Sequence, residues 1–443
     1  TYNGVQSGSL TGTIGAGNVA VSLKFTSNAY TVNFNYNKPT TDGTIGNAGT
    51  TSKAVTFDSA YGTLPAPTLN GCMFAGWYTA ASNGTKVSDT TKYATAGNST
   101  LYAHWTLNTY SIGYNLNGGS ISGQPTSYNV NTATFTLPVP TRAGYAFTGW
   151  TGTGLSSATK TVTVAKGSTG NRSYTANWSA NGYTVSFNYN KPTTDGTIGN
   201  AGTTSKAVTF DSTYGTLPTP TLNGYTFAGW YTAATNGTKV SDTTKYTTAG
   251  NSTLYAHWNL NTYSISYTLN GGSVSGQPTS YNVNTATFTL PTPTKTGYTF
   301  TGWTGSNGTA AQKSVSVAKN STGNKSYTAS WSLNTYTISY NLNGGNLSGQ
   351  KASYDVTTKA FTLPTPTRTG YTFTGWTGTG LSSATKSVTV AKGSTGNRSY
   401  TANWSANGYT VSFNYNKPTT DGSIANGTTS SKSVTFDSTY GTL

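Results

Sequence analysis

Apolar and polar residues alternate along short segments of the chain. Residues 183–189 read YTVSFNY and residues 263–269 read YSISYTL, so every second side chain is apolar. This period of two predicts β-strands with one buried face. The second segment runs into NGG at 270–272, which predicts a turn. By the same reasoning further strands are predicted at 160–164, 208–210, 225–230 and 254–258.

The alternating segment recurs along the chain, and the intervals between its copies take only two values. Its first residue is Tyr30, Tyr110, Tyr183, Tyr263, Tyr336 and Tyr409. Such regular self-similarity is the signature of a repeat architecture. We predict longer type A repeats at 28–107 and 181–260, and shorter type B repeats at 108–180, 261–333 and 334–406. Residues 407–443 match the N-terminal part of a type A repeat, and residues 1–27 the C-terminal part of a diverged repeat.

Each complete repeat contains two tryptophans, and the spacing within the pair is constant. The pairs are Trp77 and Trp105, Trp150 and Trp178, Trp230 and Trp258, Trp303 and Trp331, and Trp376 and Trp404. A repeat this short has few other large side chains to bury, so we predict that both rings belong to its core. The alternative is that they stack on glycans or on single-stranded nucleic acid. No run interleaves basic with exposed aromatic residues, so we predict no nucleic-acid partner.

Composition agrees with a mainly β chain. Glutamate is absent and charged residues make up 8%, against about 25% in typical domains. Tyrosine (32), phenylalanine (15) and tryptophan (10) are abundant, and aromatic residues favour strands. We predict a mainly β tandem array of small domains with little helix. No apolar run approaches the roughly 18 residues of a membrane helix, so we predict no membrane span in this segment.

The net charge of +16 is concentrated in the type B repeats. Type A repeats carry +1 each, whereas type B repeats carry +4, +4 and +5. The basic residues recur at four positions, namely Arg142, Lys295 and Arg368; Lys160, Lys313 and Lys386; Lys166, Lys319 and Lys392; and Arg172, Lys325 and Arg398. One interpretation is that they keep a nearly acid-free β surface soluble and unpaired. The other is that they contact an anionic polymer at weak sites that add by avidity.

The histidines and aspartates form no recognisable catalytic or metal-binding pattern. His104 and His257 occupy equivalent strand positions that point away from the core, where type B repeats have Asn or Ser. The aspartates of the type A repeats are Asp42, Asp58 and Asp89, and Asp195, Asp211 and Asp242. Their spacing matches no calcium loop, although spacing alone leaves a carboxylate pair for acid–base chemistry open. We predict no catalytic residue, no metal and no cofactor.

Cys72 is the only cysteine, so the chain has no intrachain disulfide. It stands where the other repeats have tyrosine. We expect it to replace a packed side chain, with dimerisation through the thiol as the alternative.

Two spaced motifs resemble a known family. GYTFAGW at 224–230 is followed by LYAHW at 254–258, and type B repeats carry the variant GYTFTGW at 297–303 with SYTASW at 326–331. This pattern resembles the Listeria–Bacteroides repeat, the B-repeat of internalin-type surface proteins, over about residues 28–443. The resemblance implies small β-grasp-like domains in an exported bacterial surface protein, and it implies no catalytic residues.

We therefore predict a non-catalytic extracellular repeat array that acts as a stalk, spacer or fibre segment of a bacterial cell-surface protein. Its expected partners are the neighbouring repeats of the same chain. The alternative is an adhesive module that binds anionic glycans or wall polymers through the type B repeats. Self-association into fibres is a further possibility, and an enzyme is the least supported one.

Overall fold

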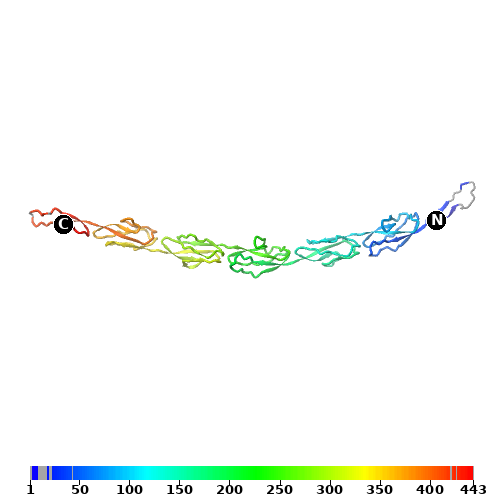
Figure 1. Ribbon diagram of the computed structural model, residues 1–443, viewed down its shortest axis with the longest axis horizontal. Coiled ribbons are helices and arrows are strands. Elements are labelled where there is room, and N and C mark those ends of the chain that lie inside the picture. The colour runs from blue at the N-terminus through cyan, green and yellow to red at the C-terminus, as the bar shows by residue number, and fades with distance from the viewer. Residues whose placement is uncertain are drawn as a thin grey trace. The chain divides into compact units, whose positions relative to one another are not determined.

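The computed structural model contains strands and loops, with no helix among the residues it describes (Figure 1). These residues are 2–7, 17–18, 22–41, 43–419, 422–425 and 427–442. Much of the segment predicted as a diverged repeat, 1–27, lies outside them. The prediction of a mainly β chain with small sheets repeated in tandem is confirmed. By its contacts the chain divides into two compact units, one of residues 1–188, 202–218 and 230–255, the other of residues 189–201, 219–229 and 256–443.

The first type A repeat forms one mixed five-stranded sheet in the order β4-β3-β7-β5-β6. The strands are β3 (Ala29–Asn35), β4 (Ser52–Thr56), β5 (Cys72–Tyr78), β6 (Lys86–Val87) and β7 (Ser99–Leu107). Strands β3 and β7 are parallel, and the other neighbours are antiparallel. The parallel pairing of β3 with β7 makes the sheet mixed.

The second type A repeat has the corresponding strands. They are β14 (Gly182–Asn188), β15 (Ser205–Thr209), β16 (Tyr225–Tyr231), β17 (Lys239–Val240) and β18 (Ser252–Leu260). Strand β14 is antiparallel to β15 and parallel to β18. Along β14, Val185 and Phe187 are buried, whereas Thr184 and Ser186 are exposed. The alternation in the sequence therefore identifies the buried face correctly.

The type B repeats keep the parallel central pair and add a separate two-stranded ribbon. The first contains β8 (Tyr110–Asn115), β9 (Ser127–Tyr128), β10 (Phe135–Thr136), β11 (Tyr145–Gly152), β12 (Thr163–Val164) and β13 (Arg172–Ala180). The second contains β19 (Tyr263–Thr268), β20 (Ser280–Tyr281), β21 (Phe288–Thr289), β22 (Tyr298–Gly305), β23 (Gly308–Gln312), β24 (Ser316–Val317) and β25 (Lys325–Leu333). The third contains β26 (Tyr336–Asn341), β27 (Ser353–Tyr354), β28 (Phe361–Thr362), β29 (Tyr371–Gly378), β30 (Thr389–Val390) and β31 (Arg398–Ala406).

The two ends of the chain contribute one antiparallel strand pair each. Near the N-terminus β1 (Tyr2–Ser7) pairs with β2 (Ser22–Phe25). Near the C-terminus β32 (Gly408–Ser412) pairs with β33 (Ser431–Thr435). The latter pairing corresponds to β14 with β15, as expected for the front of a type A repeat.

Separate hydrophobic clusters lie within residues 28–107, 108–180, 261–333 and 334–406. The first tryptophan of every pair is buried in the core, because Trp77 and Trp230 are 2% exposed and Trp150, Trp303 and Trp376 are 0% exposed. The second tryptophan of every pair is only half-buried, which differs from the prediction of two buried rings. Its indole N–H donates to a backbone carbonyl at the edge of the core, for example from Trp331 to Leu269 O at 3.0 Å. The ring therefore bridges core and surface.

Candidate functional site

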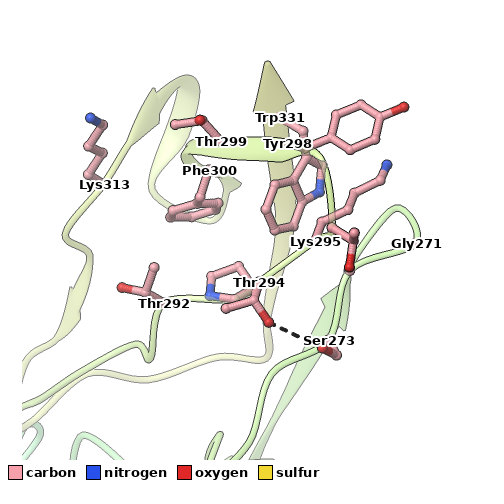
Figure 2. Close-up of a pocket in the computed structure, with 13 residues that line it drawn as sticks. Gly271, Ser273, Thr292, Thr294, Lys295, Tyr298, Thr299, Phe300, Lys313 and Trp331 are labelled. Atoms are coloured by element: carbon pink, nitrogen blue, oxygen red, sulfur yellow. Dashed lines mark hydrogen bonds between the residues drawn. The ribbon is translucent and has the colours of Figure 1, made fainter. Parts of the chain in front are cut away.

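A surface groove of about 740 Å³ lies in the type B repeat 261–333. Phe300 from β22 and Trp331 from β25 line it, with ring centroids 5.5 Å apart. Figure 2 shows Phe300 between Lys313 on one side and the Trp331 and Lys295 side chains on the other. The groove thus combines aromatic surface with two cationic side chains.

The turn at 270–272 positions Trp331 in the groove. A Cβ at Gly272 would lie 2.5 Å from Cζ2 of Trp331 and 3.0 Å from Thr294 O, so only glycine lets the ring approach the turn this closely. Next to it the hydroxyls of Ser273 and Thr294 are 3.3 Å apart and form a hydrogen bond (Figure 2). The sequence predicts the turn, but the close approach of the indole ring joins distant segments of the repeat and has no local signal.

Lys295 is held at the rim of the groove. Its Nζ donates to Asn270 O at 2.7 Å and lies 4.0 Å from the Tyr298 ring centroid and 5.9 Å from that of Trp331. Aromatic faces attract cations, so the two rings and the carbonyl fix the ammonium group. Lys313 is exposed and has no hydrogen-bonding or ionic partner among the described residues. Residues 261–333 contain no acidic side chain.

The other two type B repeats have the corresponding cationic and aromatic side chains. The guanidinium groups of Arg142 and Arg368 lie 3.8 Å and 3.6 Å from the ring centroids of Tyr145 and Tyr371. Lys160 and Lys386 are exposed, like Lys313. The phenylalanine–tryptophan pairs of these repeats, Phe147 with Trp178 and Phe373 with Trp404, are each 5.6 Å apart.

The type A repeats have a leucine where the type B repeats have the rim cation. Arg142 forms an isolated antiparallel β-bridge with Tyr145. Leu69 forms the equivalent β-bridge with Cys72, and Leu222 forms it with Tyr225. Both leucines are 5% exposed. Type A repeats therefore share the fold and the aromatic pair but lack the fixed cation.

Arg172, Lys325 and Arg398 contact the core of their repeats instead of the groove. Arg172 Nε donates to the Tyr128 hydroxyl at 2.9 Å, and Arg398 Nε donates to that of Tyr354 at the same distance. Burial lowers the pKa of Arg172, but hydrogen bonds to the hydroxyls of Tyr174 and Tyr128 outweigh burial, so the net pKa is raised. These half-buried cations stabilise the position of core tyrosines.

Lys166 and Lys319 reach the preceding type A repeat. Lys319 Nζ lies 2.6 Å from Asp195 Oδ2, and its hydrogen bond lowers the pKa of that carboxyl. Lys166 Nζ donates to the Thr41 hydroxyl at 3.4 Å. Asp42, which corresponds to Asp195, lies outside the described residues. Lys392 belongs to a repeat that follows another type B repeat, and it is exposed. Within residues 261–333 the structure therefore brings two of the four basic positions to the groove, one to the core and one to the repeat junction.

The remaining described aspartates of the two type A repeats have structural partners. Asp58 and Asp211 form exposed ion pairs with Lys92 and Lys245 at 3.1 Å and 3.0 Å. Asp89 and Asp242 accept hydrogen bonds from the backbone N–H groups of Leu64 and Leu217 at 3.0 Å and 3.1 Å. Within the described residues no three His, Cys or Asp side chains are close enough to hold a metal ion.

Cys72 is a half-buried free thiol. Burial raises its pKa, which disfavours the reactive thiolate.

We expect His104→Asn to change the free energy of unfolding by less than about 1 kcal/mol. His104 Nε2 is 2.9 Å from Ala80 O, and its ring stacks on Tyr78 at 3.9 Å. At the equivalent position Asn177 Nδ2 donates to Gly149 O at 3.1 Å, so an amide can supply such a hydrogen bond. Urea denaturation of the full chain measures the change. A loss several times larger would show that the imidazole has a role that asparagine cannot fill.

Taken together, the geometry defines a tandem array of small, mixed β-sheet modules, with a surface groove in residues 261–333. The chain belongs to the Listeria-Bacteroides repeat domain family, whose model matches residues 30–104, 110–176, 183–257, 263–329 and 336–402. The family is a repeat domain, and the matches identify no catalytic family.

Similar proteins occur in two bacteria. One protein of Evansella cellulosilytica, provisionally named a Gly-rich membrane protein, is 29% identical over 375 residues, which cover 82% of this chain and 40% of the relative. A second, provisionally named a membrane protein, is 30% identical over 284 residues, or 62% of this chain and 40% of the relative. Internalin H of Listeria monocytogenes is 42% identical over 85 residues, or 19% of this chain and 15% of that protein. The chain thus matches about 40% of the length of the two Evansella relatives. None of its described residues form a helix that is long and apolar enough to cross a bilayer.

Proposed function

We propose that this array is a non-catalytic spacer, or stalk, in a bacterial cell-surface protein, built from repeats with the boundaries predicted above. Its relationship to Internalin H and to proteins with membrane-protein names supports a surface location. Its membership of a repeat-domain family supports a structural role. The spacer interpretation itself depends on how successive repeats are joined.

The observation that carries the spacer proposal is a junction that occurs five times. The backbone N–H of the first residue after each complete repeat donates to a glycine carbonyl in that repeat, at 2.9–3.0 Å: Asn108 to Gly71, Asn181 to Gly144, Asn261 to Gly224, Asn334 to Gly297, and Asn407 to Gly370. An apolar side chain of the following repeat packs against the same glycine, namely Val130, Phe210, Val283, Val356 or Phe436. Contacts of this kind favour a fixed connection over a flexible tether.

Polar contacts add to the junction according to the order of the repeats. Where type B follows type A, Lys319 pairs with Asp195. Where type A follows type B, the Tyr145 hydroxyl donates to Asp211 at 3.3 Å and the Tyr371 hydroxyl donates to Asp437 at 3.0 Å. Exposed ion pairs and hydrogen bonds of this kind contribute little individually, so the apolar contact at glycine is the main element.

Deletion of residues 108–260 tests the spacer proposal. It removes one type B and one type A repeat and joins residues 28–107 to 261–333, an A-to-B order that the chain already contains. A unit of this size spans roughly 30–40 Å, so we expect a label-to-label distance measured from residue 30 to residue 371 to shorten by about 60–80 Å. A distance that instead follows the square root of chain length would indicate flexible tethers and contradict the proposal.

A second candidate function is adhesion to an anionic glycan. The specific observation that favours it is the groove, which places Lys295 and Lys313 beside Phe300 and Trp331 in a repeat without acidic residues. This function is compatible with a spacer, because Lys295, Lys313, Phe300 and Trp331 make no contact in the junction at Gly297.

A further inference from the structure

We propose that the groove in residues 261–333, and the corresponding faces of the other two type B repeats, bind a pyranose segment of an acidic polysaccharide. In residues 261–333 a sugar ring would lie on Phe300 and Trp331, and acidic groups of the segment would face Lys295 on one side and Lys313 on the other. This inference rests on the adhesive function proposed above and specifies its site and ligand class.

The aromatic side chains argue for a ring-containing ligand. Phe300 and Trp331 are half-buried and both line the groove, so part of each ring faces solvent. Aromatic faces carry a negative quadrupole that attracts the polarised C–H groups on the apolar face of a pyranose. A linear polyol phosphate offers no such face. A charged ligand without sugar rings would leave the aromatic part of the groove unused.

The two lysines argue for an anionic ligand. Lys295 is already fixed by Asn270 O and by the faces of Tyr298 and Trp331. Ordering its side chain on binding therefore costs little entropy. An ammonium group has three N–H donors, so Lys295 can bond to Asn270 and still donate to a ligand. Lys313 has no partner among the described residues and lies across Phe300 from Lys295 (Figure 2).

Polar groups at the base of the groove suit the hydroxyls of a sugar. Thr292, Ser273 and Thr294 line this side (Figure 2). The hydrogen bond between Ser273 and Thr294 uses one of the two hydroxyl protons. The remaining proton and lone pairs are available to a ligand.

The same two cationic positions recur in all three type B repeats, so weak binding at each repeat can add up. In chain order the exposed lysines are Lys160, Lys313 and Lys386, and the rim cations are Arg142, Lys295 and Arg368. A polymer that spans more than one groove converts the second binding event into an intramolecular one. The type A repeats provide an internal contrast, because Leu69 and Leu222 replace the rim cation.

The ligand class is tested with the full chain and matched polymers. The probes are polygalacturonate and its methyl ester, dextran sulfate and dextran, poly(glycerol phosphate), and single-stranded DNA. We expect polygalacturonate to bind at least tenfold more tightly than its methyl ester, or dextran sulfate at least tenfold more tightly than dextran. The polymer that binds more tightly identifies the preferred anionic group, carboxylate or sulfate. Equal or tighter binding of poly(glycerol phosphate) or DNA would show that pyranose rings are not recognised and would overturn the proposal. Failure to bind either acidic polysaccharide would also overturn it.

The site is tested with two triple variants of equal net charge. Lys160→Gln, Lys313→Gln and Lys386→Gln together remove the exposed groove lysines. The control, Lys86→Gln, Lys239→Gln and Lys359→Gln, removes three exposed lysines elsewhere. Because the sites act by avidity, we expect about a tenfold loss of affinity in the first variant and less than twofold in the control. Equal losses would show a non-specific charge effect and refute the site.

A further variant tests whether the ligand occupies the groove. Thr292→Trp would fill the base of the groove of residues 261–333 without altering a charged or core position, because Thr292 is exposed and lines the groove. We expect this variant to weaken binding of the preferred polysaccharide, and unchanged affinity would contradict binding in the groove. The end-to-end distances that test the spacer do not depend on these side chains, so the two proposals can fail separately.

Discussion

Replacing Trp303 with alanine is expected to unfold the repeat of residues 261–333. The side chain is 0% exposed, and its ring lies 5.4 Å from Phe300 and 5.6 Å from Tyr267. Emptying a large aromatic site in a core costs about 3–5 kcal/mol. The free energy of unfolding of a domain of this size is not much larger than that loss. We expect rapid proteolysis within 261–333 in native buffer, while the other repeats stay resistant.

The control for this prediction is Ser264→Ala in β19 of the same repeat, because Ser264 is exposed. We expect it to leave the protease resistance of residues 261–333 unchanged. Resistance that survives Trp303→Ala would show that the repeat does not depend on this ring. The interpretation of the first tryptophan as the centre of the core would then be wrong.

Replacing the first tryptophan of a repeat with phenylalanine separates the contribution of packing from that of hydrogen bonding. Trp230 Nε1 donates to Pro218 O at 2.7 Å, whereas Trp303 Nε1 is buried without a partner among the described residues. Both substitutions remove the same ring volume, but Trp230→Phe also removes a hydrogen bond, worth about 1 kcal/mol net. Trp303→Phe should therefore be the less destabilising of the two in urea denaturation. The reverse order would contradict this assignment.

The sequence alone predicts the secondary structure well where the pattern is periodic. The segment at 183–189 becomes β14 and that at 225–230 becomes β16, because alternation records which side chains face the core. The predicted strand at 160–164 is reduced to β12, Thr163–Val164, since only these two residues pair with β10. Pairs this short carry too few residues to show a period.

The candidate site is predicted less completely. The basic positions can be found by comparing repeats, but their environments depend on contacts between distant segments. Arg172 and Lys160 are equally recurrent in sequence, yet Arg172 bonds to Tyr128 of the core while Lys160 is exposed. Likewise the N–H···O bond from Trp331 to Leu269 determines that the ring reaches the surface. No local pattern in the sequence encodes either pairing.

Replacing Gly297 with alanine is expected to disrupt the junction between residues 261–333 and 334–406. Gly297 has φ = +77°, and a Cβ there would lie 2.1 Å from Val356 Cγ1 and 2.6 Å from its Cγ2. The backbone conformation alone costs a residue with a Cβ about 1–2 kcal/mol. Forcing an extra carbon into a packed contact adds about 1–3 kcal/mol. We expect a total loss of about 2–5 kcal/mol in urea denaturation, together with new protease cleavage near residue 334.

Gly276→Ala in the same repeat isolates the effect of the contact, because Gly276 has φ = +69° but a Cβ there would meet no atom within 4 Å. Its cost should be the conformational part only, with no cleavage at the junction. Val356→Ala removes the two carbon atoms that lie nearest to a Cβ at Gly297. In the Gly297→Ala background this second substitution should therefore restore part of the lost stability. In the Gly276→Ala background it should only reduce stability further. Such coupling between two repeats is measured directly by the double-mutant cycle. If Val356→Ala has the same effect in both backgrounds, the repeats are not joined through this contact, and the spacer proposal loses its main support.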